Sequence, residues 1–384
     1  MKKQAKTMKI LMAGGGSGGH VTPLLAVAKE LKKVSTGAEI VVLTDRGFFE
    51  NSKNLFKDLP DVKISKIYAG KLRRYHSKSL LWHFLYLPVL FKNIRDIIYT
   101  AIGFVQAFFV YIKIRPDVVF CKGGFVCIPV GCIAHLLKIR LIIHDSDTKP
   151  GLTNRVLSKF AETILTGMPE QFYDYTKSKM IYSGIPVDSR YSNIDSKIKK
   201  KYKTTLGFDD NAKVMLLTGG GNGSESMNKM MNSVAGELLK SGWGIIHLTG
   251  GGKSEESLKV RSELSDDLQK LWLIEEFTDM VPRMLAADIV IARTSASTLQ
   301  ECANSKKCVI GIASPHLADQ QMNSKFFSKK DAIIALDENE IDSSGAKLLT
   351  AISKITEGDY SENLYKYFAK PDATGKIVDV ILKT

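Results

Sequence analysis

Short runs of apolar residues alternate with longer amphipathic segments along most of the chain. Runs rich in Val, Ile and Leu are typical of strands buried on both faces of a parallel sheet, and segments such as Leu24–Lys33 and Met227–Lys240 have helical spacing. This alternation predicts an α/β fold with parallel sheets covered by helices. The expected strands are Lys9–Ala13, Glu39–Leu43, Val118–Cys121, Leu141–His144, Thr163–Leu165, Val214–Thr218, Gly244–Leu248, Asp288–Ala292, Val309–Ile312 and Ala332–Ala335.

The alternating pattern starts twice, each time with a strand that runs into a glycine-rich loop. The first start reads LMAGGGSGGH at 11–20, and the second reads LLTGGGNGS at 216–224. A chain of 384 residues accommodates two domains of ordinary size. We therefore expect two doubly wound, Rossmann-like domains that join near 184–193, where the alternation pauses.

Two apolar segments of the first half, Ser79–Phe91 and Ile97–Ile112, contain no Asp, Glu, Lys or Arg. Neither reaches the roughly 20 residues that cross a bilayer, so we expect no transmembrane helix. The second segment is expected to be a buried crossover helix. The first follows the basic stretch KLRRYHSK and is rich in aromatic residues, which favours a patch at a membrane surface over an ordinary core helix. The expected patch comprises Leu80, Leu81, Trp82, Phe84 and Leu85.

Basic residues are concentrated at one end of the chain. The net charge of +14 comes entirely from residues 1–150, which contain 24 Lys and Arg against 10 Asp and Glu, while the remainder holds 30 of each. Such a one-sided field favours a polyanionic partner, whether nucleic acid, an anionic membrane or a phosphorylated substrate. Five cysteines without disulfide or metal-ligand spacing fit a reducing cytoplasm, and we expect no metal site.

The first glycine loop has the chemistry of a phosphate site. Its N–H groups can approach an anion, and the next helix, with Thr22 as the expected N-cap and Pro23 as the expected first residue, adds a positive dipole. The spacing also satisfies the dinucleotide pattern, for which Asp45 would be the acidic partner. His20 is the candidate proton acceptor, and a histidine that only hydrogen-bonds the turn is the alternative. The loop alone leaves open a dinucleotide enzyme, another phosphate-ligand enzyme, or a turn that binds nothing.

Polar residues follow other expected strands. If a helix begins near Ser295, the hydroxyls of Ser297 and Thr298 at its N-terminus suit a phosphate. Glu301 shares their face and suits the vicinal hydroxyls of a sugar; a capped surface helix is the alternative. A later strand is followed by side chains of the kind that bind sugar hydroxyls, or that form a solvated loop: Asp319, Gln320, Gln321 and Asn323.

Asp145 and Asp147 form a D-x-D at the end of a first-domain strand. This spacing can present carboxylates to Mg²⁺ beside a diphosphate. Because no further ligands follow nearby in the sequence, we favour a polar substrate-binding or helix-capping role over a metal site.

Eight stretches in order resemble motifs of the MurG family of peptidoglycan N-acetylglucosaminyltransferases, in glycosyltransferase family 28. The final segment DATGKIVDVIL (372–382) also resembles the closing helix of that family. The eight stretches are GGGSGGHVTPLLAVA (14–28), RPDVVFCKGGFVCIP (115–129), HDSDTKPGLTNR (144–155), GIPV (184–187), TGGGNGS (218–224), EFTDM (276–280), ARTSASTLQE (292–301) and DQQMNS (319–324).

The resemblance implies a GT-B fold, in which two Rossmann-like domains face each other across a cleft. Residues 1–183 would bind the acceptor and the membrane, 184–365 would bind UDP-GlcNAc, and 366–384 would form a helix that crosses back to the first domain. The implied reaction moves GlcNAc from UDP-GlcNAc, with inversion, to the C4 hydroxyl of MurNAc in lipid I and yields lipid II. The enzyme would be peripheral on the anionic cytoplasmic face of the cell membrane, with no cofactor and no nucleic acid.

The resemblance also implies roles for individual residues. His20 would assist deprotonation of the attacking hydroxyl, and the loop Gly15–Gly19 would hold the acceptor diphosphate. Acceptor-binding residues would be Gly15, Gly16, Lys122, Gly123, Gly124, Asp145, Asp147 and Asn154. Donor-binding residues would be Ser17, Gly18, Gly19, Arg190, Gly220, Gly221, Asn222, Gly223, Phe277, Thr278, Ala296, Ser297, Thr298, Leu299, Glu301, Gln320 and Gln321.

Three positions depart from the family pattern. Asp188 stands where the family has an arginine, Gly221 where it has a serine, and Asp147 where it has an asparagine; Arg190 is the candidate to replace the missing donor-side arginine. The open alternatives are a related GT-B transferase that uses a UDP-sugar and another lipid acceptor, a dinucleotide-dependent Rossmann oxidoreductase, and a non-catalytic membrane or nucleic-acid binder.

Overall fold

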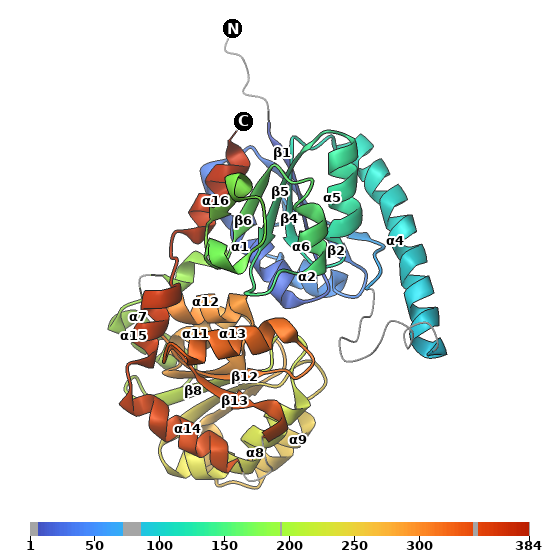
Figure 1. Cartoon of the computed structure of the whole chain (residues 1–384). Coiled ribbons are helices and arrows are strands. Elements are labelled where there is room, and N and C mark those ends of the chain that lie inside the picture. The colour runs from blue at the N-terminus through green and yellow to red at the C-terminus, as the bar shows by residue number, and fades with distance from the viewer. Residues whose placement is uncertain (1–6, 72–85, 193, 341–344, 384) are drawn as a thin grey trace. The chain divides into compact units, whose positions relative to one another are not determined.

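The computed structural model describes residues 7–71, 86–192, 194–340 and 345–383 (Figure 1). The chain forms two compact units. The first unit comprises Met1–Ser146, Pro150–Pro186 and Ala373–Thr384, and the second comprises Asp147–Lys149 and Val187–Asp372. The two units are therefore not simple halves of the sequence, because the C-terminal segment returns to the first unit and a short stretch after residue 146 groups with the second.

The first unit is built on a parallel sheet with strand order β3-β2-β1-β4-β5-β6-β7. Its strands are β1 Lys9–Gly14, β2 Glu39–Asp45, β3 Lys63–Ile67, β4 Val118–Gly123, β5 Arg140–Asp145, β6 Thr163–Thr166 and β7 Met180–Tyr182. Its helices are α1 Gly18–Val34, α2 Phe49–Leu55, α4 Leu87–Ile114, α5 Cys127–Leu136, α6 Leu152–Leu157 and α16 Ala373–Leu382.

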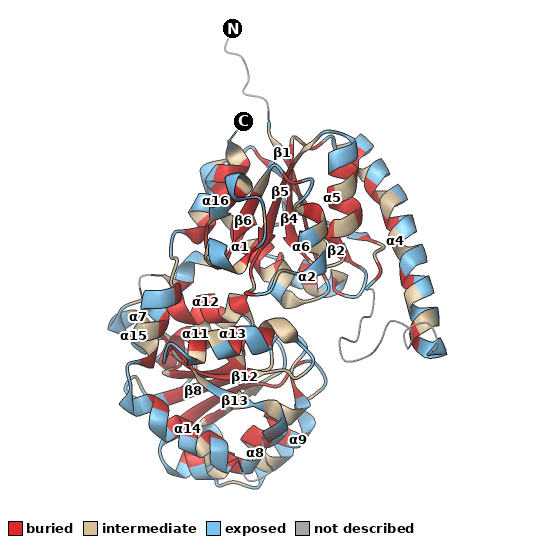
Figure 2. Ribbon diagram, viewed as in Figure 1, coloured by how far each residue is buried: buried red, intermediate tan, exposed pale blue. Residues whose placement is uncertain are grey.

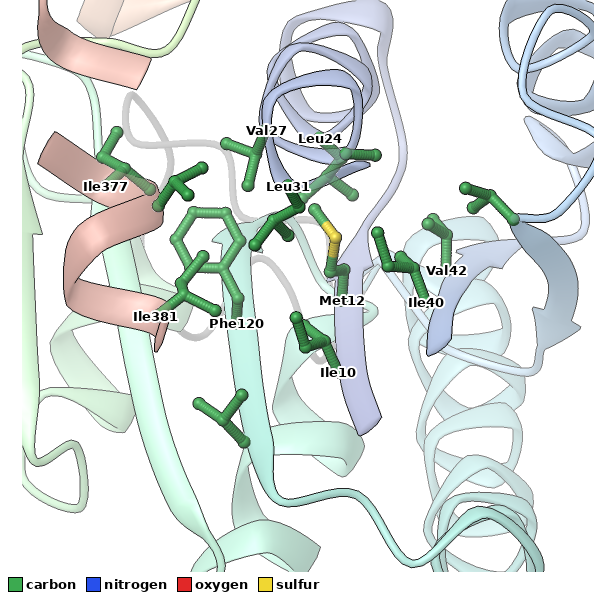
Figure 3. Close-up of a cluster of buried hydrophobic side chains, with 14 of the residues drawn as sticks. Ile10, Met12, Leu24, Val27, Leu31, Ile40, Val42, Phe120, Ile377 and Ile381 are labelled. Atoms are coloured by element: carbon green, nitrogen blue, oxygen red, sulfur yellow. The ribbon is translucent and has the colours of Figure 1, made fainter. Parts of the chain in front are cut away.

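One core cluster of the first unit lies between the sheet and helices α1 and α16 (Figure 3). Met12 of β1 and Phe120 of β4 meet Leu31 of α1 and Ile381 of α16, and all four side chains are fully buried. Each such side chain contributes about 1.5–3 kcal/mol by leaving water. The last helix of the chain therefore completes the core of the first unit.

The second unit is built on a parallel sheet with strand order β10-β9-β8-β11-β12-β13. Its strands are β8 Lys213–Thr218, β9 Trp243–Leu248, β10 Trp272–Glu275, β11 Ile289–Arg293, β12 Cys308–Ala313 and β13 Ile334–Asp337. Its helices are α7 Ser196–Thr205, α8 Glu225–Lys240, α9 Glu255–Ser262, α10 Asp266–Lys270, α11 Met280–Ala286, α12 Ala296–Asn304, α13 Ala318–Ser328, α14 Ala346–Glu357 and α15 Tyr360–Phe368.

The ten expected strands are confirmed, with the last displaced toward the C-terminus. The sequence pattern missed β3, β7 and β10, each of which lies at the edge of its sheet. Edge strands are solvated on one side and short, so they lack the continuous apolar run that identifies a central strand. The α/β class with two doubly wound, Rossmann-like units is likewise confirmed.

The start of α1 differs from the expected one. The sequence predicts Thr22 as the N-cap and Pro23 as the first helical residue, but the helix begins at Gly18, with Ser17 as its N-cap, and Pro23 lies inside it. Gly18, Gly19 and His20 therefore form the first turn of a helix, and of the loop glycines only Gly15 and Gly16 remain in the loop before it. Because the first backbone N–H groups of a helix have no intrahelical partner, such a turn can point its donors at a ligand.

The expectation for Ile97–Ile112 was wrong, because this segment is not buried. It belongs to the 28-residue helix α4, which has Pro88 in its first turn. Most of its outward face is exposed (Figure 2). Within the described residues, α4 is long and apolar enough to cross a membrane, so the expectation that no segment reaches that length was also wrong. The expected patch at Leu80, Leu81, Trp82, Phe84 and Leu85 lies outside the described residues.

Candidate active site

In the first unit, the loops that follow β1 and β4 are in close contact. A Cβ placed on Gly124 would lie 2.3 Å from the carbonyl oxygen of Gly15, and Gly124 has a φ of +83°. Gly123 at the end of β4 and Gly124 also lie against His20, since a Cβ on Gly123 would lie 3.2 Å from its Nδ1 and one on Gly124 would lie 3.1 Å from its Cδ2. Glycine is required here because any side chain would separate the two loops.

His20 lies in the first turn of α1 with its Nδ1 atom buried and without a hydrogen-bond partner in the described structure. Burial, with the nearby ammonium groups of Lys122 and Lys71, lowers the pKa of His20 to about 3. The imidazole is therefore neutral at physiological pH, and with so low a pKa it is a weak base in the free protein.

Asp45 at the end of β2 anchors the first glycine loop. Its Oδ1 accepts a hydrogen bond from Gly16 N (2.6 Å), and its Oδ2 accepts hydrogen bonds from Gly47 N (3.0 Å) and Phe48 N (3.2 Å). The carboxylate is thus engaged by backbone donors rather than available to a ribose, as the dinucleotide alternative requires.

The end of β5 carries a second polar group. Asp145 accepts a hydrogen bond from the hydroxyl of Tyr175 (2.6 Å), and Asn154 donates to the carbonyl of His144 (3.2 Å). The buried ammonium of Lys122 donates to the hydroxyl of Ser146 (2.5 Å). Because parallel strands end at one edge of the sheet, the predicted residues His20, Lys122, Asp145 and Asn154 lie on the same side of the first unit.

Asp147 groups with the second unit, whereas Asp145 groups with the first. The Oδ1 of Asp147 accepts a hydrogen bond from Asn323 (3.3 Å), and Thr148 donates to the Oδ1 of Asn323 through its hydroxyl (2.9 Å). The two acids of the D-x-D thus contact different partners, and no cluster of three metal-ligating side chains occurs among the described residues.

The second glycine loop follows β8 and leads into α8. A Cβ on Gly220 or Gly221 would meet no atom within 4 Å, whereas one on Gly223 would lie 2.1 Å from the carbonyl of Thr249. Gly223 is thus required for the packing of two loops, while Gly220 and Gly221 present open backbone ahead of a helix N-terminus. That arrangement suits a phosphate group.

Helix α12 begins as the sequence predicts. Ser295 is its N-cap and accepts a hydrogen bond from Thr298 N (3.3 Å), which places Ser297 in the first turn. Glu301 lies one turn further and is only 9% exposed. Burial, together with nearby Asp188, raises the pKa of Glu301 to about 8. Its carboxyl group can therefore form hydrogen bonds with hydroxyl groups in an environment largely shielded from solvent.

The predicted glutamines on α13 have different environments. The Oε1 of Gln320 accepts a hydrogen bond from Ser314 N (3.2 Å), and its side chain is largely buried. Gln321 is exposed and donates to the carbonyl of Pro315 (2.9 Å). Neighbouring Asn323 is fully buried and also donates to the carbonyl of Thr294 (3.0 Å), which ties α13 to the end of β11.

Arg190 is held between two carboxylates. It pairs with Asp188 (3.0 Å) and Asp279 (2.9 Å), and Asp188 also accepts from its backbone N–H. The acid that replaces the family's arginine thus binds the arginine proposed to compensate for it. Phe277 and Thr278 directly precede Asp279, and the ring of Phe277 is 50% exposed, as a residue at the edge of a base-binding site can be.

Sequence reasoning missed an ion pair beside the second glycine loop. Arg293 donates hydrogen bonds from Nη1 (2.7 Å) and Nη2 (2.5 Å) to the two carboxylate oxygens of Glu338. Its Nη2 also donates to the hydroxyl of Ser224 (2.7 Å). Glu338 also accepts from Ser226 in the first turn of α8. Arg293 lies within the motif ARTSASTLQE, which could have suggested a role for it. Glu338 lies in no recognised motif, so the sequence does not indicate that it pairs with Arg293.

Comparisons with known proteins agree along the whole chain. The N-terminal domain model of glycosyltransferase family 28 matches residues 10–166, and the C-terminal domain model matches residues 214–374. The chain is 32% identical to a Clostridium perfringens protein over 388 residues, covering 99% of each chain. It is 33% identical to a Clostridium kluyveri protein over 387 residues, covering 98% of this chain and 99% of the relative.

The chain belongs to glycosyltransferase family 28. Both relatives are named UDP-N-acetylglucosamine–N-acetylmuramyl-(pentapeptide) pyrophosphoryl-undecaprenol N-acetylglucosamine transferase. Among solved structures, Acinetobacter baumannii MurG is similar with a TM-score of 0.66 at 23% identity, covering 98% of this chain and 100% of that one. The predicted GT-B fold class is thereby confirmed.

Membership of family 28 makes the chain a glycosyltransferase, as the resemblance implied. It excludes the dinucleotide oxidoreductase and the non-catalytic binder. The geometry of the first unit agrees, since Asp45 is committed to the glycine loop. The question that remains for this family 28 chain is which acceptor and donor it uses.

Proposed function

We propose that the chain transfers GlcNAc from UDP-GlcNAc to the C4 hydroxyl of MurNAc in lipid I, with inversion, to give lipid II. The observation that carries this proposal is the full-length similarity to relatives that are named for the reaction. The two glycine loops support it, because a donor and an acceptor that each contain a diphosphate call for two anion sites.

In the proposed reaction, the imidazole of His20 removes the proton from the C4 hydroxyl as the oxygen attacks C1 of GlcNAc. The new C4–O–C1 bond forms while the bond between C1 and the β-phosphate oxygen breaks, and UDP leaves with the electron pair. A single displacement of this kind inverts C1. The buried Nδ1 without a hydrogen-bond partner supports the assignment, and because the pKa of His20 in the free protein is about 3, an efficient base requires bound substrate to raise that pKa toward neutrality.

The second unit would bind the donor. The open backbone at Gly220 and Gly221 and the hydroxyls of Ser297 and Thr298 would surround the diphosphate and stabilise the charge that develops on departing UDP. Glu301 would accept hydrogen bonds from the ribose hydroxyls. Gln320 and Gln321 would contact the GlcNAc, with Gln320 held by Ser314.

The decisive test is transfer of radiolabelled GlcNAc by the purified protein to lipid I and, in parallel, to diacylglycerol. We expect labelled lipid II and no labelled glycolipid from diacylglycerol. His20→Ala should lower kcat by about 100-fold or more, the usual contribution of a general base, with UDP affinity unchanged. Failure of the wild-type protein to label lipid I would overturn the proposal.

We also propose that the enzyme works as a peripheral protein on the cytoplasmic face of the cell membrane, with α4 at the lipid surface. Relative to an ordinary surface helix, the polar and apolar sides of α4 are exchanged. The side facing the domain uses polar side chains: Gln106 accepts from Tyr68 N (2.8 Å), Thr100 accepts from Gly70 N (3.1 Å), and Tyr111 donates to the carbonyl of Val130 (2.8 Å).

The other side of α4 is apolar and open. Ten large apolar residues of the helix are between 37% and 66% exposed, a continuous surface of the kind that marks a membrane or protein interface. The basic charge of residues 1–150 favours an anionic membrane. The ten are Leu87, Phe91, Ile94, Ile97, Ile98, Ile102, Val105, Phe108, Phe109 and Ile112.

Vesicle flotation tests the membrane role. Replacement of Phe91, Ile98 and Phe109 together by Glu should abolish binding to phosphatidylglycerol vesicles and leave UDP binding intact, because these side chains are exposed. The matched control is Leu136→Glu, which changes an exposed apolar residue of the first unit outside α4 and should float normally. Normal flotation of the triple variant would refute the role of α4.

A further inference from the structure

The first glycine loop on its own is a weak site for a diphosphate. The N–H of Gly16 is already bound by Asp45, and that carboxylate places a negative charge beside the loop. A diphosphate carries further negative charge, so cations close by would strengthen its binding. The structure provides them on the next strands of the same sheet edge.

Arg46 directly follows Asp45 at the end of β2 and lies on the surface. Its Nη1 donates to the hydroxyl of Tyr68 (2.5 Å), and its guanidinium lies 4.6 Å from the centre of that ring. In the described part of the chain, no carboxylate forms an ion pair with Arg46. A guanidinium that is fixed in place while its other N–H donors stay available is well suited to bind a phosphate.

Tyr68 connects Arg46 to α4. Its backbone N–H donates to Gln106 (2.8 Å), and a Cβ on Gly103 would lie 2.0 Å from its carbonyl oxygen. Lys71, three residues further on, is exposed and close enough to His20 to lower the pKa of that imidazole. Neighbouring strands lie about 4.8 Å apart, so β1, β2 and β3 bring the glycine loop, Arg46 and Tyr68 into succession toward α4.

We propose that Arg46, fixed by Tyr68, and Lys71 bind the diphosphate of the polyprenyl-linked acceptor between the first glycine loop and α4. This assignment rests on the function proposed above. It matches the order of the groups in such an acceptor. The sugar would lie at His20, the diphosphate at Arg46 and Lys71, and the polyprenyl chain would extend toward the exposed apolar side of α4. Phospholipid head groups carry the same phosphate chemistry, so the test must separate the two sources.

Steady-state transfer to lipid I in detergent provides the test. Arg46→Ala should raise the KM for lipid I about 10-fold and leave kcat and the KM for UDP-GlcNAc within about twofold, the pattern of lost substrate binding. Arg46→Lys should show a smaller rise in the KM for lipid I than Arg46→Ala, since lysine restores the positive charge but not the planar, bidentate guanidinium. The matched control is Lys63→Ala, which removes one charge from the opposite end of β3 and should change neither KM.

Flotation on phosphatidylglycerol vesicles without lipid I distinguishes the two phosphate sources. Arg46→Ala should float as the wild type does; loss of flotation would reassign Arg46 to phospholipid head groups and overturn the proposal. An unchanged KM for lipid I in Arg46→Ala, while the wild type makes lipid II, would refute this inference alone. If the wild type makes no lipid II, the function proposed above fails instead.

Discussion

Glu301 shows what a buried acid contributes to this protein at the scale of one residue. Its position on α12 is readable from the spacing of ARTSASTLQE, but its environment is not. Burial and Asp188 raise its pKa to about 8, so the carboxyl is protonated in the free enzyme at neutral pH. Hydrogen bonds from ribose hydroxyls would favour the carboxylate, which would couple donor binding to release of a proton.

The raised pKa of Glu301 makes the stability of the protein depend on pH. The folded state keeps the carboxyl protonated up to about pH 8, whereas the unfolded chain ionises it near its ordinary value of 4.5. The associated stability is complete below pH 4.5 and lost as the pH rises through about 8. Relative to wild type, Glu301→Gln should gain about 2 kcal/mol or more in free energy of unfolding between pH 5 and pH 9.

Urea unfolding at pH 5, 7 and 9 measures this difference directly. Other titrating groups are common to both proteins, so only the gap between the two curves is informative. Parallel curves across that range would mean that Glu301 is ionised in the folded protein.

At the scale of an element, α4 is the part of the fold whose surface contradicts the ordinary rule for a soluble helix. Its small and polar residues face the domain, and its apolar residues face outward. The helix approaches the chain after β3 so closely that Gly103 and Gly70 leave no space for side chains: a Cβ on Gly70 would overlap the carbonyl of Asp96. Close backbone packing and side-chain hydrogen bonds therefore hold α4, because its apolar surface is not used inside the domain.

Gly103→Ala tests this packing. Alanine favours a helix over glycine by about 1 kcal/mol, yet its Cβ would lie 2.0 Å from the carbonyl of Tyr68. We expect a net loss of about 1–3 kcal/mol in free energy of unfolding from the forced displacement. The reverse change at an exposed position, Ala101→Gly, should cost about 1 kcal/mol through helix propensity alone.

Urea denaturation of both variants decides the matter. If Gly103→Ala were as stable as the wild type, α4 would not pack as closely against the chain after β3 as the structure indicates.

At the scale of the whole molecule, each unit has its own sheet and core, and the last helix belongs to the first unit. Arg140 of β5 helps to hold that helix by donating to the carbonyls of Val380 (2.9 Å) and Ile381 (3.3 Å). The first unit therefore cannot complete its core until α16 has been synthesised.

Thermal unfolding should separate the two units. Ile381→Ala should destabilise the first unit by about 2–5 kcal/mol, while Ile352→Ala should destabilise the second by a similar amount. UDP at 100 times its Kd should stabilise the second unit by about 2.7 kcal/mol. In calorimetry, UDP should thus raise the transition temperature of the second unit, which Ile352→Ala lowers. It should leave unchanged the transition temperature of the first unit, which Ile381→Ala lowers. The reverse pairing would place the donor in the first unit.

The fold class, the ten strands with continuous apolar runs, the two glycine loops and the N-terminus of α12 follow from the amino-acid sequence alone. These features depend on local chemistry: apolar runs form central strands, and a serine at the correct position caps a helix. The start of α1, the edge strands, the commitment of Asp45 to the glycine loop, and the assignment of Asp145 and Asp147 to different units depend on tertiary structure. Tertiary structure also decided that the apolar residues of α4 face outward. The spacing of apolar residues shows that a helix has an apolar side. Whether that apolar side faces the core or the solvent is shown only by the contacts that the helix makes in the folded protein.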